Sequence, residues 1–206
     1  MKQGDEKIFR YRDVELSHAV IAELDSIFFE ASATRTFQND TARTAFRHRW
    51  LGRYLEFNPG EAFLAFAGTN SSELAGYLVG ALADPATDPH QQDLGYFKEF
   101  APLTRRYPAH LHVNVAMQYR TRNIGARLLE TFIAHAGDCG APGVHVVTGK
   151  GMRNVGFYER NGFLPLAEAP WNGRTVLMLG RSIGQTPKRG LDIGPIRGLT
   201  WPTVVK

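Results

Sequence analysis

The amino-acid sequence predicts an α/β fold of the α+β kind. Its central mixed sheet is expected to be mostly antiparallel, with one parallel strand pair, and to be flanked by helices. Residues 109–148 alternate strand, helix and strand, and two strands joined by one such helix run parallel. Residues 62–83 form two strand-like runs separated by Gly, Thr, Asn and Ser, which indicates a hairpin. Asn172-Gly173 joins two further strand-like runs, so antiparallel strands are expected there.

The first half is expected to contain a strand, two helices and two strands: residues 8–12, 17–31, 40–55, 62–67 and 74–83. In the first helix, apolar side chains recur every three or four residues, which gives one buried face. Ser17 stands directly before this helix, where its hydroxyl would cap the first free amides. The second helix ends before Pro59 and Gly60, because these residue types stop a helix.

The second half is expected to contain a strand, a helix, a strand, a helix and two strands: residues 109–117, 123–136, 144–148, 152–161, 163–166 and 175–179. Residues 84–108 connect the halves, with a short helix expected near residues 96–100. A connection of this length is often functional. We therefore expect one domain over residues 1–182, followed by an extended basic tail rich in glycine and proline over residues 183–206.

Composition narrows the classes of partner. A chain of 206 residues is long enough for one substantial hydrophobic core, and its formal charge of +4 favours anionic partners. The basic residues are scattered rather than gathered in a stripe, so nucleic acid is not the expected partner. No apolar run reaches the length of a membrane span and no secretory signal is visible, so we expect a cytoplasmic protein with no membrane partner. The single cysteine, Cys139, is expected to be a buried small apolar residue.

The strand at residues 109–117 leads into a helix whose first turn combines small and basic residues. Gly125 and Ala126 leave room for another group to approach the backbone, and Arg120 and Arg122 add positive charge. The first amides of a helix have no partner within the helix and form the positive end of its dipole. These features together are typical of a binding site for a diphosphate.

This segment resembles the signature of the GCN5-related N-acetyltransferase (GNAT) family. The signature is Arg or Gln, two residues, Gly, one residue, then Gly or Ala, directly after a strand. Arg120 and Gly125 match it, whereas Asn123 replaces a glycine; Asn is among the residues best able to adopt a left-handed conformation. The resemblance implies acetyl-CoA as cofactor, in a cleft beside the parallel strand pair. The residues expected to hold its diphosphate are Arg120, Thr121, Arg122, Asn123, Ile124, Gly125 and Ala126.

A second segment of the family pattern follows the next strand. The resemblance places Asn154 against the pantetheine arm of the cofactor and Tyr158 beside its sulfur. Their four-residue spacing puts both on one helical face. A tyrosine hydroxyl, whose ordinary pKa is about 10, can give a proton to the departing thiolate. The backbone of the cofactor strand, at Val115 and Met117, is expected to bind the pantetheine amides.

The attacking amine must lose a proton, which requires a base or a water relay. His110, His112 and Asn114 alternate along the expected strand and share one face. Since histidine titrates near neutrality, His112 and His110 are the candidate catalytic bases, and the resemblance suggests that they relay protons through water. Asn114 cannot act as a base, and Glu99 and Asp93 are weaker candidates. No metal site is expected, because the histidines lack metal-ligand spacing beyond His110 and His112.

These features predict an acyl-CoA-dependent N-acyltransferase that moves an acetyl group from acetyl-CoA to a primary amine by direct attack in a ternary complex. A non-catalytic acyl-CoA-binding regulatory module is the alternative, and a nucleic-acid-binding domain ranks below both. The acceptor, a small-molecule or peptide amine, is left open, as is a homodimer. Aromatic residues of the first two helices and of the 84–108 segment are candidates for lining its pocket: Phe28, Phe29, Phe37, Trp50, Tyr54, Tyr96, Phe97 and Phe100.

Overall fold

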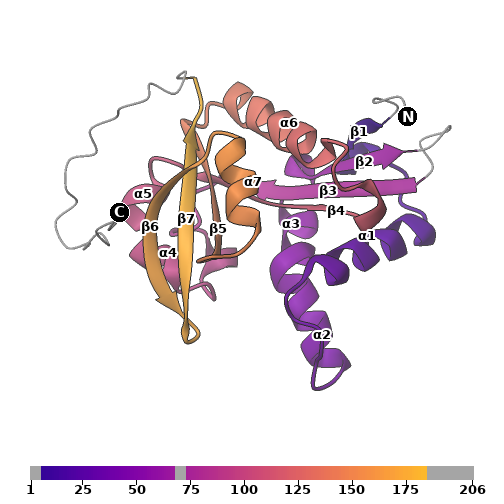
Figure 1. The fold of residues 1–206 in the computed structure, drawn as a ribbon, viewed down its shortest axis with the longest axis horizontal. Helices are drawn as coiled ribbons and strands as arrows, with labels where there is room; N and C mark the ends of the chain where they lie inside the picture. Colours follow the sequence, from indigo (N-terminus) through magenta and orange to yellow (C-terminus); the bar gives the residue numbers. More distant parts are fainter. Residues whose placement is uncertain (1–5, 68–72, 185–206) are drawn as a thin grey trace.

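The computed structural model describes residues 6–67 and 73–184, and these form one sheet with helices against both of its faces (Figure 1). The strands are β1 (Lys7–Arg10), β2 (Phe63–Ala67), β3 (Glu73–Ala81), β4 (Ala109–Val115), β5 (Gly143–Gly149), β6 (Leu164–Trp171) and β7 (Arg174–Ser182). The helices are α1 (His18–Ala31), α2 (Asp40–Arg47), α3 (Arg53–Phe57), α4 (Tyr96–Glu99), α5 (Ala101–Thr104), α6 (Ile124–Asp138) and α7 (Asn154–Arg160). The expected turn at residues 68–72 and the expected tail beyond Gly184 lie outside the described residues.

The sheet has the strand order β1-β2-β3-β4-β5-β7-β6, and every neighbouring pair is antiparallel except β4 and β5. This confirms the predicted mixed, mostly antiparallel sheet with one parallel pair. The last two strands meet in a tight turn at Asn172 and Gly173, whose φ angles of 48° and 72° are both left-handed. Two successive left-handed residues are what a two-residue hairpin requires, so the local sequence alone fixes this edge of the sheet.

The parallel pair separates soon after it begins. Only Ala109 with Val144 and His110 with His145 are in register, although β4 continues to Val115 and β5 to Gly149. Beyond the paired rows the two strands form a fork (Figure 1). The inner edge of each strand therefore has backbone groups that the neighbouring strand does not bind, which a ligand with amide groups can use instead.

Helices cover the two faces of the sheet in different ways. Helix α6 packs on β2, β3 and β4, and α1 packs on β3 and β4 from the opposite side (Figure 1). Gly80 makes close packing of α6 possible, because a Cβ atom at this position would lie 2.5 Å from the ring of Phe132. The core beneath α6 is fully buried at Leu128, Leu129 and Phe132. This packing fixes the start of α6 relative to the fork.

The helices begin close to where the sequence predicts. Ser17 caps α1 by accepting a hydrogen bond from the amide of Val20, and Asn39 caps α2 through the amide of Ala42. Helix α2 continues into α3 through a π-helical turn at His48–Gly52, so the expected second helix is one rod with a local widening. A short helix does lie in the 84–108 segment, at α4, and α5 follows it directly.

Several expectations were wrong. Strand β1 ends at Arg10 rather than at residue 12, because Tyr11–Asp13 form a 3-10 helix, and β6 runs to Trp171 rather than to residue 166, since it pairs with β7 as far as the hairpin turn. Strand β4 ends at Val115 rather than at Met117, because Met117–Tyr119 turn into a 3-10 helix. Helix α6 begins at Ile124, one residue later than expected, since Asn123 has a left-handed backbone. Cys139 is exposed at the end of α6 instead of buried. In residues 6–67 and 73–184, the helices are all too short or too polar to cross a membrane.

Candidate active site

The connection between β4 and α6 has an uncommon backbone. Thr121 and Asn123 have φ angles of 74° and 62°, in the left-handed region that non-glycine residues seldom adopt. For threonine, whose Cβ is branched, this conformation costs about 1–2 kcal/mol. Such strain is retained where the surrounding structure holds it, commonly at binding sites. Asn123 therefore takes the conformation that the sequence comparison with glycine predicted for it.

The first turn of α6 is open to a ligand. Asn123 occupies the N-cap position, but its side chain makes no capping hydrogen bond. The amides of Ile124, Gly125 and Ala126 thus have neither a helical acceptor nor a side-chain cap. An anion at this place would accept hydrogen bonds from these amides and would gain about 0.3–1 kcal/mol from the helix dipole. The geometry fits a diphosphate.

The arginines near this turn have different partners. Arg120 donates from Nε to the carbonyl oxygen of Val115 at 3.2 Å, so its side chain folds back over the end of β4. The guanidinium of Arg122 lies 5.0 Å from the centre of the Tyr119 ring, in a cation–π contact. Arg127 is committed to the N-terminal segment, donating to both the side chain and the backbone carbonyl of Glu6. Arg120 and Arg122 are accordingly the cations that flank the open turn.

Gly125 has a packing role in addition to the one predicted from the sequence. A Cβ atom at this position would lie 3.3 Å from the Phe157 ring and 3.5 Å from the side chain of Val115. Small size at Gly125 therefore lets α7 approach α6 closely at the point where the fork opens. The phosphate site and the helix packing require the same residue.

Helix α7 brings Asn154 and Tyr158 to the β5 side of the fork. Asn154 lies exposed at the start of the helix, and its Oδ1 accepts a hydrogen bond from Thr148 on β5 at 2.9 Å. Tyr158 is buried against Phe157 and Phe163. Burial raises the pKa of Tyr158 above its ordinary value, so the hydroxyl keeps its proton at neutral pH. Gly162, with a left-handed φ of 81°, follows the end of the helix, a position where glycine is favoured.

The strand histidines face the side of the sheet opposite α6. His112 lies between two aromatic side chains: the Trp50 ring packs edge-on against it at 5.6 Å, and the Tyr54 hydroxyl lies 3.4 Å from its Nε2. His110 is almost fully buried behind it, with Nδ1 3.3 Å from the carbonyl oxygen of Pro108. The Asn114 amide donates to the Tyr77 hydroxyl at 2.8 Å. The alternation predicted from the sequence is thus confirmed as a shared face.

Burial changes the proton affinity of these histidines. It lowers the pKa of His110 and of His112 to about 4, and that of His145, which stacks on His110, to about 3. His112 keeps some contact with solvent, whereas the Nε2 atoms of His110 and His145 are sealed off without a hydrogen-bond partner among the described residues. All three imidazoles are therefore neutral at pH 7.

An ion pair between a buried arginine and an exposed aspartate holds the α3 segment against residues 84–108. Arg53, only 6% exposed, donates to both carboxylate oxygens of Asp93 at 2.8 and 2.9 Å, and also to the side chain of Gln91. The hydrogen bond from Arg53 is the main reason that the pKa of the Asp93 carboxyl lies below its ordinary value. Asp93, a weaker candidate for the base, is thus paired, while Glu99 lies exposed on α4.

The aromatic candidates for an acceptor pocket separate into two groups. Phe28, Phe97 and Phe100 are buried core residues. Trp50 is only partly buried and packs edge-on against Trp171 at the end of β6. Trp171, Gln91 and Arg53 were missed from the sequence. For Trp50 and Tyr54 a signal existed, since their four-residue spacing places them on one helical face.

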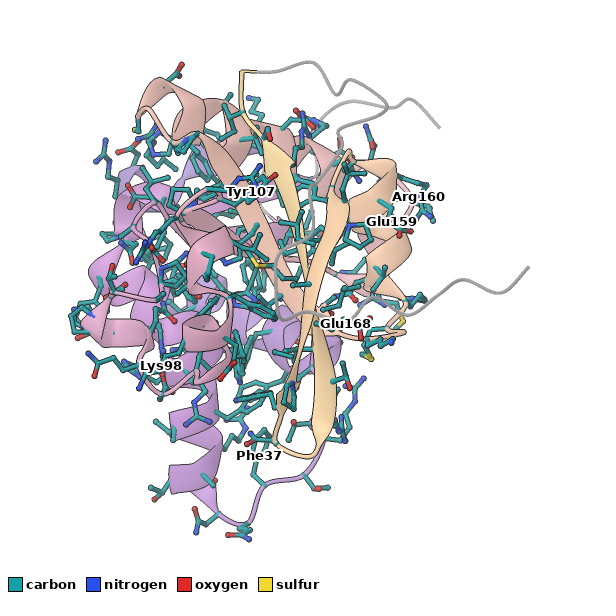
Figure 2. All side chains as sticks on the ribbon, turned by 90° about the vertical axis from the view of Figure 1, so that its left-hand side faces the viewer. Phe37, Lys98, Tyr107, Glu159, Arg160 and Glu168 are labelled. Atoms are coloured by element: carbon teal, nitrogen blue, oxygen red, sulfur yellow. The ribbon has the colours of Figure 1, made fainter. Side chains whose placement is uncertain are left out.

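A surface hollow of about 870 Å³ lies between α1 and α2. Its lining includes Asp25, Phe29 and Phe37, the last of which is labelled at the lower end of the molecule in Figure 2. Asp25 forms an ion pair with Arg47 at 2.6 Å, and both charges act on the nearby hydroxyl of Tyr77. Within the described part of the chain, no three or more His, Cys, Asp or Glu side chains gather as they would around a metal ion.

Comparison with known proteins agrees with this geometry. The model of the acetyltransferase (GNAT) family matches residues 21–163. The fold is similar to the crystal structure of SsHAT, at 21% identity over 88% of this chain and 100% of that one, with a TM-score of 0.65. It is also similar to an agmatine N-acetyltransferase in its apo form (16% identity, 87% and 100% coverage, TM-score 0.61). The NatC complex bound to Gag peptide and CoA is a further neighbour (14% identity, 86% and 96% coverage, TM-score 0.55). The family match spans most of the sheet and both helices of the fork, and the chain belongs to the GNAT family of acetyltransferases.

Proposed function

We propose that this chain transfers an acetyl group from acetyl-CoA to a primary amine by direct attack within a ternary complex. One observation carries the proposal: the fork between β4 and β5 opens directly onto the uncapped first turn of α6. A strand edge with free backbone groups beside a diphosphate-sized cradle suits an extended ligand that has amides at one end and phosphates at the other.

In this proposal the first turn of α6 holds the cofactor by its diphosphate. The amides from Ile124 to Ala126 donate to the phosphate oxygens, and Arg120 and Arg122 compensate the negative charge. The Val115 carbonyl oxygen already accepts from Arg120, which leaves the Val115 amide for the pantetheine arm. Asn154 is bound to Thr148 on β5 and is the proposed contact from α7. Met117 lies beyond the end of β4 and is 64% exposed, so we assign it only an outer contact. Acetyl-CoA, once bound, supplies an acetyl thioester.

Tyr158 is the proposed proton donor to the departing sulfur. Its hydroxyl comes from α7, the helix that packs on α6 through Phe157 and Gly125, so it belongs to the same rigid unit as the cradle. The raised pKa keeps it protonated at neutral pH, as a donor requires. General acid catalysis of this kind typically contributes about 10²–10⁴-fold to the rate.

The amine is proposed to approach from the face of β4 that holds the histidines. That face lies opposite α6, so acceptor and cofactor would reach the strand from different sides. His112 is the residue in reach of solvent there, with His110 behind it. Because burial lowers both pKa values to about 4, each imidazole is a weak base and stays neutral at pH 7. We therefore propose that they help to pass the amine proton to solvent through water and do not act as its final acceptor.

The experiment is a thiol-release assay with acetyl-CoA over a diverse panel of amines. Once an acceptor is found, Tyr158→Phe should lower kcat about 10²–10⁴-fold and leave the dissociation constant of acetyl-CoA nearly unchanged. Tyr11→Phe, in a half-buried tyrosine before α1, is the matched control and should retain full activity. Equal kcat for the two variants would refute the role of Tyr158.

Two further results test the proposal, one against a covalent acyl-enzyme and one against the alternative of a non-catalytic module. Direct attack predicts intersecting initial-rate lines when both substrates are varied, whereas a covalent acyl-enzyme predicts parallel lines. Tight binding of acetyl-CoA without thiol release for any amine would favour the regulatory module. Asn123, which replaces a glycine of the family signature, has a left-handed backbone that a glycine would also adopt, so this difference is compatible with cofactor binding.

A further inference from the structure

A chain of buried polar side chains leads from an ion pair to the His112 imidazole. Arg53 donates to Gln91 Oε1 at 3.2 Å, Gln91 lies beside the Tyr54 hydroxyl, and this hydroxyl lies 3.4 Å from His112 Nε2. Arg53, Gln91 and Tyr54 are 6%, 1% and 1% exposed, so water has little access to the chain. Its members come from α3, from residues 84–108 and from β4.

The charged end of the chain sets the direction of its hydrogen bonds. A guanidinium can only donate, so Gln91 Oε1 accepts from Arg53. The Gln91 side chain lowers the pKa of Tyr54, which is the effect of its amide nitrogen donating to the phenol oxygen. A hydrogen bond from that nitrogen stabilises the Tyr54 oxygen, and it opposes the effect of burial, which raises the pKa of Tyr54. With its oxygen accepting, the Tyr54 hydroxyl has its own proton to donate, and His112 Nε2 lies within reach.

We propose that Tyr54 is a positioning residue that holds His112 in the neutral tautomer protonated on Nδ1, so that His112 is a hydrogen-bond donor on the acceptor side and not the base. Nε2 must be unprotonated in order to accept from Tyr54, which leaves the single ring proton on Nδ1. The Trp50 ring, edge-on against the imidazole, restricts its rotation. The imidazole is thereby fixed in both orientation and tautomer.

The catalytic consequence rests on the proposed function, whereas the tautomer does not. In the proposed relay, an Nδ1–H group can donate to a water molecule or to a carbonyl oxygen of the acceptor, but it cannot take the ammonium proton directly. The proton then leaves through water. This role distinguishes His112 from His110, whose Nδ1 lies against the backbone oxygen of Pro108.

Nitrogen-15 NMR of the histidine side chains tests the tautomer in the unmodified protein. Protonated and unprotonated ring nitrogens resonate far apart, and His112 is assigned by the signal that is lost in His112→Asn. At pH 7 we expect the Nδ1 resonance of His112 at the position of a protonated nitrogen and the Nε2 resonance at that of an unprotonated one. Tyr54→Phe should move both resonances toward the positions of a free histidine, in which the two tautomers exchange and the signals are averaged. Tyr96→Phe, in a buried tyrosine of α4, is the matched control and should leave the His112 signals in place.

A His112 proton found on Nε2, a doubly protonated ring at pH 7, or signals that are already averaged in the unmodified protein would each overturn the proposal. An activity comparison gives a second readout. The Asn side chain places an N–H close to that of Nδ1, and the Gln side chain places one close to that of Nε2. Both substitutions should reduce kcat/KM, and His112→Gln should reduce it about tenfold more, the effect of one lost hydrogen bond. The reverse order would overturn the proposed donor. If no amine is acetylated by any variant, the proposed function fails while the NMR result stands by itself.

Discussion

Replacing Asn123 with valine tests whether the backbone before α6 exists to bind the cofactor. Asn123 has a φ of 62°, and a β-branched residue in that conformation pays about 1–2 kcal/mol that asparagine largely avoids. Asn172, with a φ of 48° in the hairpin turn between β6 and β7, is a matched control in the same backbone region. We therefore expect Asn123→Val and Asn172→Val to lower the free energy of unfolding by similar amounts, measured by urea denaturation.

The two variants should differ in cofactor binding, measured by calorimetric titration with acetyl-CoA. A backbone that leaves the left-handed region turns the amides of Ile124 and Gly125 away from the phosphate oxygens. Loss of one hydrogen bond to a charged group costs about 1.5–3 kcal/mol, which weakens binding at least about tenfold. We expect this loss in Asn123→Val only, with Asn123→Gly within about threefold of the unmodified protein. Equal affinities in Asn123→Val and Asn172→Val would refute the argument that this turn holds the diphosphate.

Three further outcomes follow from the packing and charge of the fold, each measured by urea denaturation. Gly80→Ala should lower the free energy of unfolding by about 1–3 kcal/mol, because the added Cβ would lie 2.5 Å from Phe132 and 2.6 Å from the backbone oxygen of His110. Gly95→Ala, with open space around the added Cβ, should leave the free energy of unfolding unchanged. Arg53→Met should lower the free energy of unfolding by about 1–3 kcal/mol, because it leaves the buried side-chain oxygen of Gln91 without its donor. Arg49→Met, in an exposed pair with the same Asp93 carboxylate, should lower it by less than about 1 kcal/mol; equal losses would contradict the assigned burial. Stability should also fall as the pH drops from 6.5 toward 4, because unfolded histidines bind protons there while His110, His112 and His145 stay neutral in the fold. The free energy of unfolding should fall less steeply with pH in His145→Leu. A free energy of unfolding that does not change between pH 6.5 and 4 in the unmodified protein would contradict the assigned burial of the histidines.

Local chemistry made much of this fold predictable. Ser17 and Asn39 cap their helices, Gly162 ends α7, and Asn172-Gly173 closes a hairpin, each through hydrogen bonds or φ angles that depend on near neighbours in the chain. The parallel pair followed from the length of its crossover. The signal for the proposed phosphate-binding turn was also local, since Arg120, Asn123 and Gly125 lie within six residues.

Contacts between distant segments were not predictable in the same way. The Tyr54 hydroxyl meets His112 across 58 positions, and Arg53 meets Asp93 across 40. Neither partner carries a local signal for the other, because the contact depends on how α3 and the 84–108 segment pack on the sheet. The lowered pKa values of the histidines have the same origin, since burial is a property of the assembled layers. The end of β4 was predicted two residues too late because a local turn replaces the strand there, in which the Tyr119 amide donates to the Ala116 carbonyl oxygen.

A crystal structure of the complex with coenzyme A tests the central claim most directly. We expect the diphosphate oxygens within hydrogen-bonding distance of the backbone nitrogens of Ile124, Gly125 and Ala126, and the pantetheine arm between β4 and β5. A diphosphate bound anywhere else, or a fork closed by strand pairing beyond His110 and His145, would contradict the account.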